Sequence, residues 1–127
     1  MNKFFSFLIG SFVAIALLTS FDIKSNTTVA DGKFEIPENI NAIFKKSCFG
    51  CHNTDSKNED GKEELMIDKL SKLKKSKLAS KLNKIAKTTA EGEMPPEKFL
   101  KKYPDKALTD EEAKTLIEWA KASAEAL

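Results

Sequence analysis

The chain has 127 residues, of which 31% are charged, and its 21 basic residues against 19 acidic ones give a formal net charge of +2. This length allows one domain and excludes a second. Once the N-terminal segment described next is set aside, roughly a hundred residues remain, and the core of so small a domain is marginal on its own.

The N-terminal segment has the composition of an export signal. Lys3 supplies a positive charge, residues 4–18 are apolar apart from two serines and a glycine, and the sequence turns polar from Thr19. Small residues before Asp31 predict cleavage after Ala30. The apolar run is shorter than the roughly 20 residues of a membrane-spanning helix, but residues 19–23 bring it near that limit, so a retained membrane anchor is the alternative. We therefore divide the chain into a signal peptide or anchor (residues 1–30) and one exported, periplasmic domain (residues 31–127).

The first helix of that domain is predicted over residues 37–47. Pro37 suits the start of a helix, where its missing N–H has no partner to lose. Ile40, Ile43 and Phe44 follow at the i, i+3, i+4 spacing of one apolar helix face. We expect these three side chains in the core, and the helix ends where Cys48 begins the next motif.

That motif, Cys48-Phe49-Gly50-Cys51-His52, contains the only two cysteines and the only histidine of the chain. Two thiols three positions apart, followed directly by an imidazole, are the pattern that attaches c-type haem. Both thiols can reach the vinyl groups on one edge of a porphyrin, and the next side chain can turn under the ring to bind iron. The pattern predicts one covalently attached haem, whose apolar surface would also help so short a chain to fold.

Three other interpretations of the motif were weighed. A structural zinc site needs four ligands, and the usual nitrogen and sulfur donors here are only Cys48, Cys51 and His52. A thioredoxin-like motif expects a βαβ surrounding that the rest of the sequence does not predict. A disulfide with this spacing would close a very short loop and stabilise the fold little.

The stretch after the motif is predicted to be a loop and then helical. Residues 53–62 are polar and include Gly61, which favours a loop. Two apolar stripes out of phase with each other then predict two helices, or one interrupted helix, between residues 62 and 87, with a break near residues 75–76. The first stripe contains Leu65, Met66, Lys69, Leu70 and Leu73, and the second contains Leu78, Leu82, Ile85 and Ala86.

The same region is strongly basic. Eight lysines lie between Lys69 and Lys87, and Asp68 is the one acid between residues 65 and 90. A solvated helix face accounts for such a run. It would also suit docking of an acidic redox partner protein, because a positive potential raises the encounter rate. Nucleic acid is not an expected partner of an exported haem protein.

The helical stretch ends at Gly92, a residue suited to a helix C-terminus, and Met94-Pro95-Pro96 follows. Two prolines forbid a helix and stiffen the backbone, so Met94 is held as an axial thioether ligand requires. A methionine is also common core filler. We assign Met94 as the distal iron ligand opposite His52, because Met66 lies in a helical stripe and there is no second histidine.

The C-terminal region is predicted to end in a capped helix. Phe99, Leu100 and Tyr103 are expected to pack the returning loop, in the haem pocket or in ordinary core. Thr109 and Glu112 then form a capping box. In the helix that follows, the buried face comprises Ala113, Leu116, Ile117 and Ala120, with Trp119 beside it at the rim, where its indole N–H could reach a haem propionate.

Taken together, these motifs resemble the small monohaem cytochromes c, and more narrowly the cytochrome-c-related haem-binding domain of exported bacterial proteins. The resemblance rests on residues 43–52, 92–96, 108–112 and 116–120 and covers about residues 36–122. It implies an all-α, cytochrome c-like fold with the N- and C-terminal helices packed around a haem linked through Cys48 and Cys51, and iron between His52 and Met94. Many cytochromes c also have a proline whose carbonyl accepts the Nδ1–H of the ligand histidine, but residues 53–93 contain no proline.

The expected function is single-electron transfer by a monomeric carrier that is not an enzyme. His/Met ligation raises the reduction potential and leaves no open iron site. A haem catalyst would need such a site and usually a distal acid–base residue, and the chain has no second histidine and no arginine. The alternative is a redox or gas sensor in which a ligand displaces Met94. A membrane association is expected only if residues 1–30 are retained.

Overall fold

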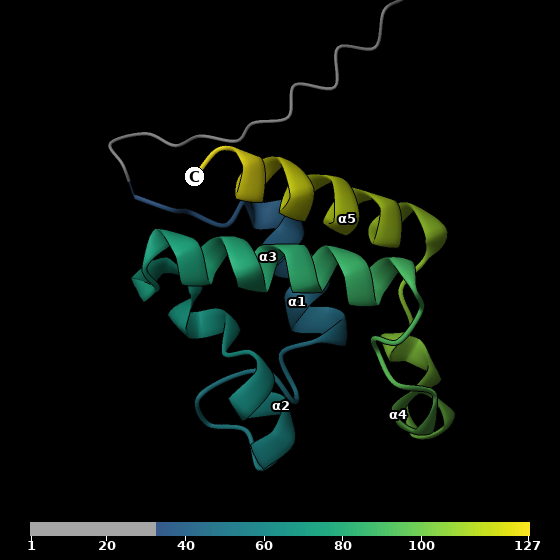
Figure 1. The fold of residues 1–127 in the computed structure, drawn as a ribbon. Helices are drawn as coiled ribbons and strands as arrows, with labels where there is room; N and C mark the ends of the chain where they lie inside the picture. The colour runs from purple at the N-terminus through teal and green to yellow at the C-terminus, as the bar shows by residue number, and fades with distance from the viewer. Residues whose placement is uncertain (1–32) are drawn as a thin grey trace, which may run out of the picture.

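The computed structural model describes residues 33–127, so the predicted signal peptide or anchor lies outside the described residues. Within this range all regular structure is helical (Figure 1), which confirms the all-α prediction. Five α-helices and two short 3₁₀ helices follow one another: α1 (Glu38–Ser47), α2 (Glu59–Glu64), η2 (Ile67–Lys72), α3 (Lys75–Ala90), α4 (Glu97–Lys102), η3 (Pro104–Lys106) and α5 (Asp110–Glu125). In this part of the chain no helix is both long and apolar enough to cross a membrane.

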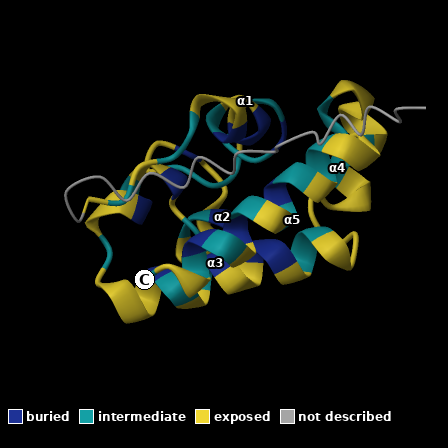
Figure 2. Cartoon of the chain, turned by 90° about the horizontal axis from the view of Figure 1, so that it is seen from above, coloured by how far each residue is buried: buried dark blue, intermediate teal, exposed yellow. Residues whose placement is uncertain are grey.

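The two longest helices, α3 and α5, lie side by side, and α1 crosses them (Figures 1 and 2). The apolar faces of all three helices meet in one core. The predicted core residues Ile40, Ile43 and Phe44 of α1 are buried there, as are Leu116 and Ala120 of α5. From α3, the core receives the whole predicted stripe of Leu78, Leu82, Ile85 and Ala86.

The first and last helices contact each other through an aromatic pair and an ion pair. The Phe44 ring meets Trp119 edge to face, with the ring centroids 5.7 Å apart. Lys46 Nζ lies 2.6 Å from the Glu112 carboxylate, and this hydrogen bond holds the pKa of Glu112 below its usual range. The crossing that the sequence resemblance implied is therefore present. Trp119 is half-buried against Phe34 as well as Phe44.

Two predicted helix ends are confirmed by their hydrogen bonds. Thr109 and Glu112 form the capping box at the start of α5, each side chain accepting from the other residue's backbone N–H. At the end of α3, Gly92 has φ +69°, Glu93 N–H donates to Thr88 O at 2.9 Å, and Gly92 N–H donates to Thr89 O at 3.2 Å. This pair of bonds is a Schellman motif. It turns the chain sharply into the Met94-Pro95 segment.

Between Asn53 and Leu73 the structure differs from the sequence prediction. Helix α2 begins inside the expected loop because the Asn58 side chain caps it, accepting from Gly61 N–H at 2.8 Å. Residues 67–72 then form a 3₁₀ helix, in which side chains three apart share one face. Ile67 and Leu70 are consequently buried, while Met66 is exposed. The predicted break lies at Leu73 and Lys74, whose backbone is extended.

Helix α4 also lies in a region predicted as a returning loop. None of its residues is buried, and the Phe99 and Tyr103 rings pair with each other at 5.1 Å. Figure 1 shows α2 and α4 on opposite sides of the molecule below α3, with α1 between them. The segment that follows Cys48 and contains α2 therefore lies on one side of α1, and the segment that follows Gly92 and contains α4 lies on the other.

Candidate functional site

A pocket of about 300 Å³ lies where α1, α2, α3 and α5 converge with the segment after α3. This volume is at the lower end of the range of cofactor and ligand pockets, about 300 to 1,000 Å³. Its apolar wall comprises Phe44, Leu65, Ile85 and Leu116. Cys48, His52 and Met94 also line it, so three residues singled out from the sequence meet in one place.

The turn that follows α1 positions the two cysteines and the histidine. Cys48 and Phe49 N–H both donate to Phe44 O, at 2.9 and 2.8 Å, and the N–H groups of Cys51 and His52 both donate to Cys48 O at 3.1 Å. Because α1 ends in this closed turn, the motif is held against the core helix that precedes it. Cys48 lines the pocket, whereas Cys51 is not among its lining residues.

Both cysteines are free thiols in this structure. Burial, together with the neighbouring Cys51, raises the pKa of the Cys48 thiol to about 12. At neutral pH the Cys48 thiol is therefore protonated and uncharged. Across residues 33–127, no three His, Cys, Asp or Glu side chains gather as a metal ion would require.

The His52 ring is oriented by backbone carbonyls of the α2 segment. Its Nδ1 lies 2.7 Å from Gly61 O and 3.3 Å from Leu65 O. A carbonyl oxygen only accepts, so Nδ1 carries the proton and Nε2 keeps a free lone pair. This is the tautomer that binds a metal through Nε2. The His52 backbone is also tied down, since its carbonyl accepts from Ile67 N–H at 3.0 Å.

Gly61 supplies the carbonyl partner of the His52 Nδ1–H, a partner that the sequence did not reveal. An added Cβ on Gly61 would lie 2.6 Å from Cys51 O, closer than real Cβ atoms approach. Only glycine therefore lets α2 come close enough to the motif for the His52 hydrogen bond. The one sequence signal was Asn58 three residues before Gly61, the spacing of a helix cap.

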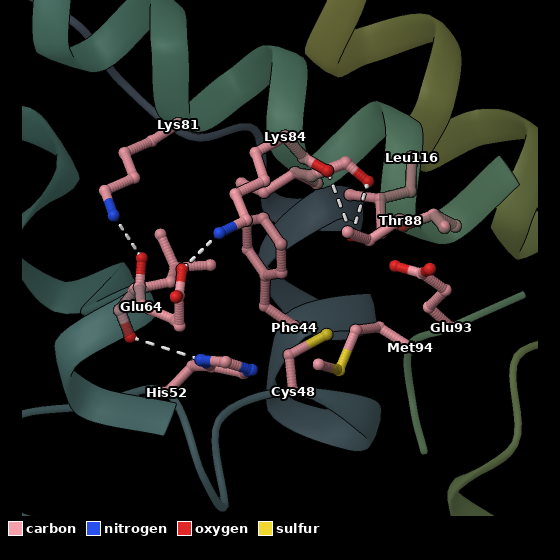
Figure 3. Close-up of a pocket in the computed structure, with 13 residues that line it drawn as sticks. Phe44, Cys48, His52, Glu64, Lys81, Lys84, Thr88, Glu93, Met94 and Leu116 are labelled. Atoms are coloured by element: carbon pink, nitrogen blue, oxygen red, sulfur yellow. Dashed lines mark hydrogen bonds and ion pairs between the residues drawn. The ribbon is translucent and has the colours of Figure 1, made fainter. Parts of the chain in front are cut away.

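Met94 approaches the pocket from the side opposite His52. Figure 3 shows the imidazole and the thioether directed toward each other, with Cys48 near Met94. The backbone on either side is constrained by the Schellman turn at Gly92 and by Pro95, which is buried. Met94 itself remains 38% exposed.

Met66, the other methionine within the described residues, lies elsewhere. It is equally exposed, at 38%, but it does not line the pocket, and its sulfur is 4.0 Å from the Thr54 hydroxyl. Trp119, Phe99, Leu100 and Tyr103 are also absent from the pocket lining. The aromatic side chain of the pocket lining is Phe44 of α1, and none comes from the C-terminal region.

A polar edge completes the pocket. Glu64, Lys81, Lys84 and Glu93 line it together with Thr88 and Thr89 (Figure 3). Lys84 forms an ion pair with the Glu64 carboxylate, and Lys81 donates to the Glu64 backbone carbonyl. From the sequence, Lys81 and Lys84 were predicted only as part of the lysine-rich run, and Glu64 and Glu93 had no predicted role in the site.

The all-α fold and this pocket, with an oriented imidazole facing a thioether, define an α-helical protein with a largely apolar pocket. The family model described as a haem-binding domain matches residues 54–122. The chain belongs to this haem-binding domain family. No curated protein and no solved structure matches it significantly.

The matched segment contains Met94 and the pocket-lining part of α3, and it begins two residues after His52. The pocket residues fit a haem: an apolar wall, an imidazole with its lone pair on Nε2, and a thioether facing it. When bound, haem supplies an iron centre that accepts and gives one electron. The chain's own groups supply the orientation of the imidazole and the apolar surroundings.

Proposed function

We propose that the protein is an exported c-type cytochrome with one haem that carries single electrons. The observation that carries this proposal is the juxtaposition of His52 and Met94 across a pocket that also contains Cys48. In this proposal Cys48 and Cys51 form thioether bonds to the haem, and His52 and Met94 bind iron on its two faces. It is not an enzyme, because two protein ligands leave no open site for substrate at iron.

The export part of the proposal is supported by residues 1–30, whose composition is that of a signal peptide or membrane anchor. Covalent haem attachment to this motif takes place outside the cytoplasmic membrane. A periplasmic location, soluble or anchored, is therefore consistent with the proposed cofactor chemistry. Mass spectrometry of the matured protein tests both points, since one added haem and the new N-terminus are read in the same measurement.

The ligand assignment predicts that Met94→Ala abolishes the weak sulfur-to-iron band near the red end of the ferric spectrum. Removing the thioether leaves iron with His52 alone, so a high-spin ferric spectrum is expected. Met66→Ala is the matched control, because Met66 is exposed to the same degree but does not line the pocket. Loss of the band in the control and not in Met94→Ala would overturn the assignment.

A sensor is the second candidate function, and the place of Met94 in the chain favours it. Met94 lies in the segment between α3 and α4 and not on a helix, so an incoming ligand can displace its thioether without moving a helix. Carbon monoxide added to the ferrous protein separates the two functions. Binding within seconds would favour the sensor, and absence of binding on that timescale favours the electron carrier.

We further propose that the lysine-rich surface over residues 69–87 docks an acidic redox partner. Several of these lysines have local partners: Lys69 pairs with Asp68, Lys84 with Glu64 and Lys87 with Glu91. Among the described residues, no ion pair involves Lys72, Lys74 or Lys77. These three exposed side chains therefore carry the net charge of the proposed docking surface together with Lys75 and Lys81, whose ammonium groups donate to backbone oxygens.

Replacing Lys72, Lys74 and Lys77 by Gln is expected to slow electron transfer to an anionic oxidant several-fold at low salt, because the attraction that steers it is lost. Stopped-flow kinetics with hexacyanoferrate(III) measures this, and the difference should shrink as ionic strength rises. Removal of the same charge at Lys98, Lys102 and Lys121 is the control. An equal effect of both triple variants would exclude a localised docking surface.

A further inference from the structure

Lys81 and Lys84 differ from the other lysines of α3 in that they line the pocket. Figure 3 shows both side chains descending from α3 toward Glu64, the last residue of α2. Lys84 binds the carboxylate of Glu64, and Lys81 binds its backbone carbonyl. Two cations thus share the oxygens of one residue at the edge of a largely apolar pocket.

This arrangement is poorly explained as a contribution to stability. The Lys84 and Glu64 side chains are each 55% exposed, and ion pairs between exposed side chains contribute about 0 to 1 kcal/mol. Exposed side chains of this kind can also change partner at little cost. Lys81 and Lys84 are therefore available to another carboxylate that enters the pocket.

Haem carries two such carboxylates. Its propionate groups lie on the edge of the macrocycle away from the vinyl groups, and the vinyl groups are the ones that would join Cys48 and Cys51. In Figure 3 Cys48 lies at the lower side of the pocket beside Met94, and the ammonium groups of Lys81 and Lys84 lie above and to the left of it, next to Glu64. The lysines are thus placed away from the cysteine edge, where the carboxylates are expected.

The other charges of the pocket also favour placing the propionates next to Lys81 and Lys84. The charged lining residues are Glu64, Lys81, Lys84 and Glu93. Glu93 is adjacent to Met94 and would repel a carboxylate, whereas the two lysines attract one. A carboxylate taken into a partly apolar site needs a cation and hydrogen-bond donors, and in this pocket the lysine ammonium groups supply both.

We propose that Lys81 and Lys84 bind the two haem propionates. This inference rests on the proposed function, because it takes the haem edge joined to Cys48 and Cys51 as given. It assigns a binding role to two residues that are otherwise part of a lysine-rich surface.

The experiment is proton NMR of the diamagnetic ferrous holoprotein. Cross-relaxation peaks are expected between the propionate methylene protons and the ε-methylene protons of Lys81 and Lys84. A second measurement is the reduction potential of the double variant Lys81→Gln/Lys84→Gln. This variant should have a lower potential than the wild type, because two positive charges next to the haem are removed. The control Lys74→Gln/Lys77→Gln removes the same charge at the start of α3, outside the pocket, and should shift the potential less.

Two results would overturn the proposal. One is a spectrum in which the propionate protons contact other residues and neither lysine. The other is an equal shift of potential in the pocket variant and the control. Both are obtained on protein whose covalent haem has been verified by mass, so they leave the proposed function standing. Protein without covalent haem after maturation would instead remove the proposed function, and this inference with it.

Discussion

Gly61→Ala is expected to destabilise the holoprotein by about 1 to 3 kcal/mol, the range found for inserting a methyl group into a packed site. The new Cβ would lie 2.6 Å from Cys51 O and 3.2 Å from Cys51 Cβ. The backbone of α2 must therefore move away from the haem motif. That movement takes Gly61 O away from His52 Nδ1, which it now contacts at 2.7 Å.

Two readouts separate the steric effect from the effect on the ligand. Denaturant unfolding measures the loss of stability. The reduction potential of the haem measures how strongly the His52 imidazole donates electrons to iron. Its hydrogen bond to a carbonyl makes the imidazole a stronger donor, so the potential should rise when the bond is lost. Glu63→Ala is the control, since Glu63 is an exposed residue of the same helix and lies outside the haem motif. If both variants behaved alike, the special role of Gly61 would be refuted.

Phe44→Ala is expected to cost about 3 to 5 kcal/mol of unfolding free energy, as for other buried aromatic residues. The side chain is 1% exposed, packs edge to face on Trp119 and forms part of the pocket wall. A loss of this size is a large fraction of the 5 to 15 kcal/mol that stabilises a typical domain. Thermal or denaturant unfolding followed by circular dichroism measures it.

Phe99→Ala provides the comparison for that loss. Phe99 is paired with Tyr103 on α4, a helix with no buried residue. Because its ring is already partly in water, its removal should cost much less than removal of Phe44. A loss at Phe99 as large as that at Phe44 would show that α4 belongs to the stabilising core, contrary to its position here.

The helical faces were predictable because each depends on residues close together in the chain. Ile40, Ile43 and Phe44 are buried as their spacing indicated, and the capping box at Thr109 and the stop at Gly92 are local patterns of hydrogen bonds. Between residues 53 and 73 the prediction was right in part: residues 53–58 form a loop and Leu70 is buried, but α2 begins at Glu59 inside the expected loop. In the 3₁₀ helix over residues 67–72 the period is three and not 3.6, so Ile67 replaces Met66 on the buried face.

The sequence by itself identified the candidate donor atoms of the site, because a Cys-x-x-Cys-His motif and a proline-flanked methionine indicate this chemistry by residue type and spacing, and it favoured Met94 over Met66. It did not determine what surrounds them. Only the tertiary structure brought Met94 and His52 to one pocket, gave His52 the carbonyl of Gly61, and brought Lys81 and Lys84 to Glu64. These contacts join separate helices and turns, and their geometry follows from how α1, α3 and α5 pack, which no local pattern encodes.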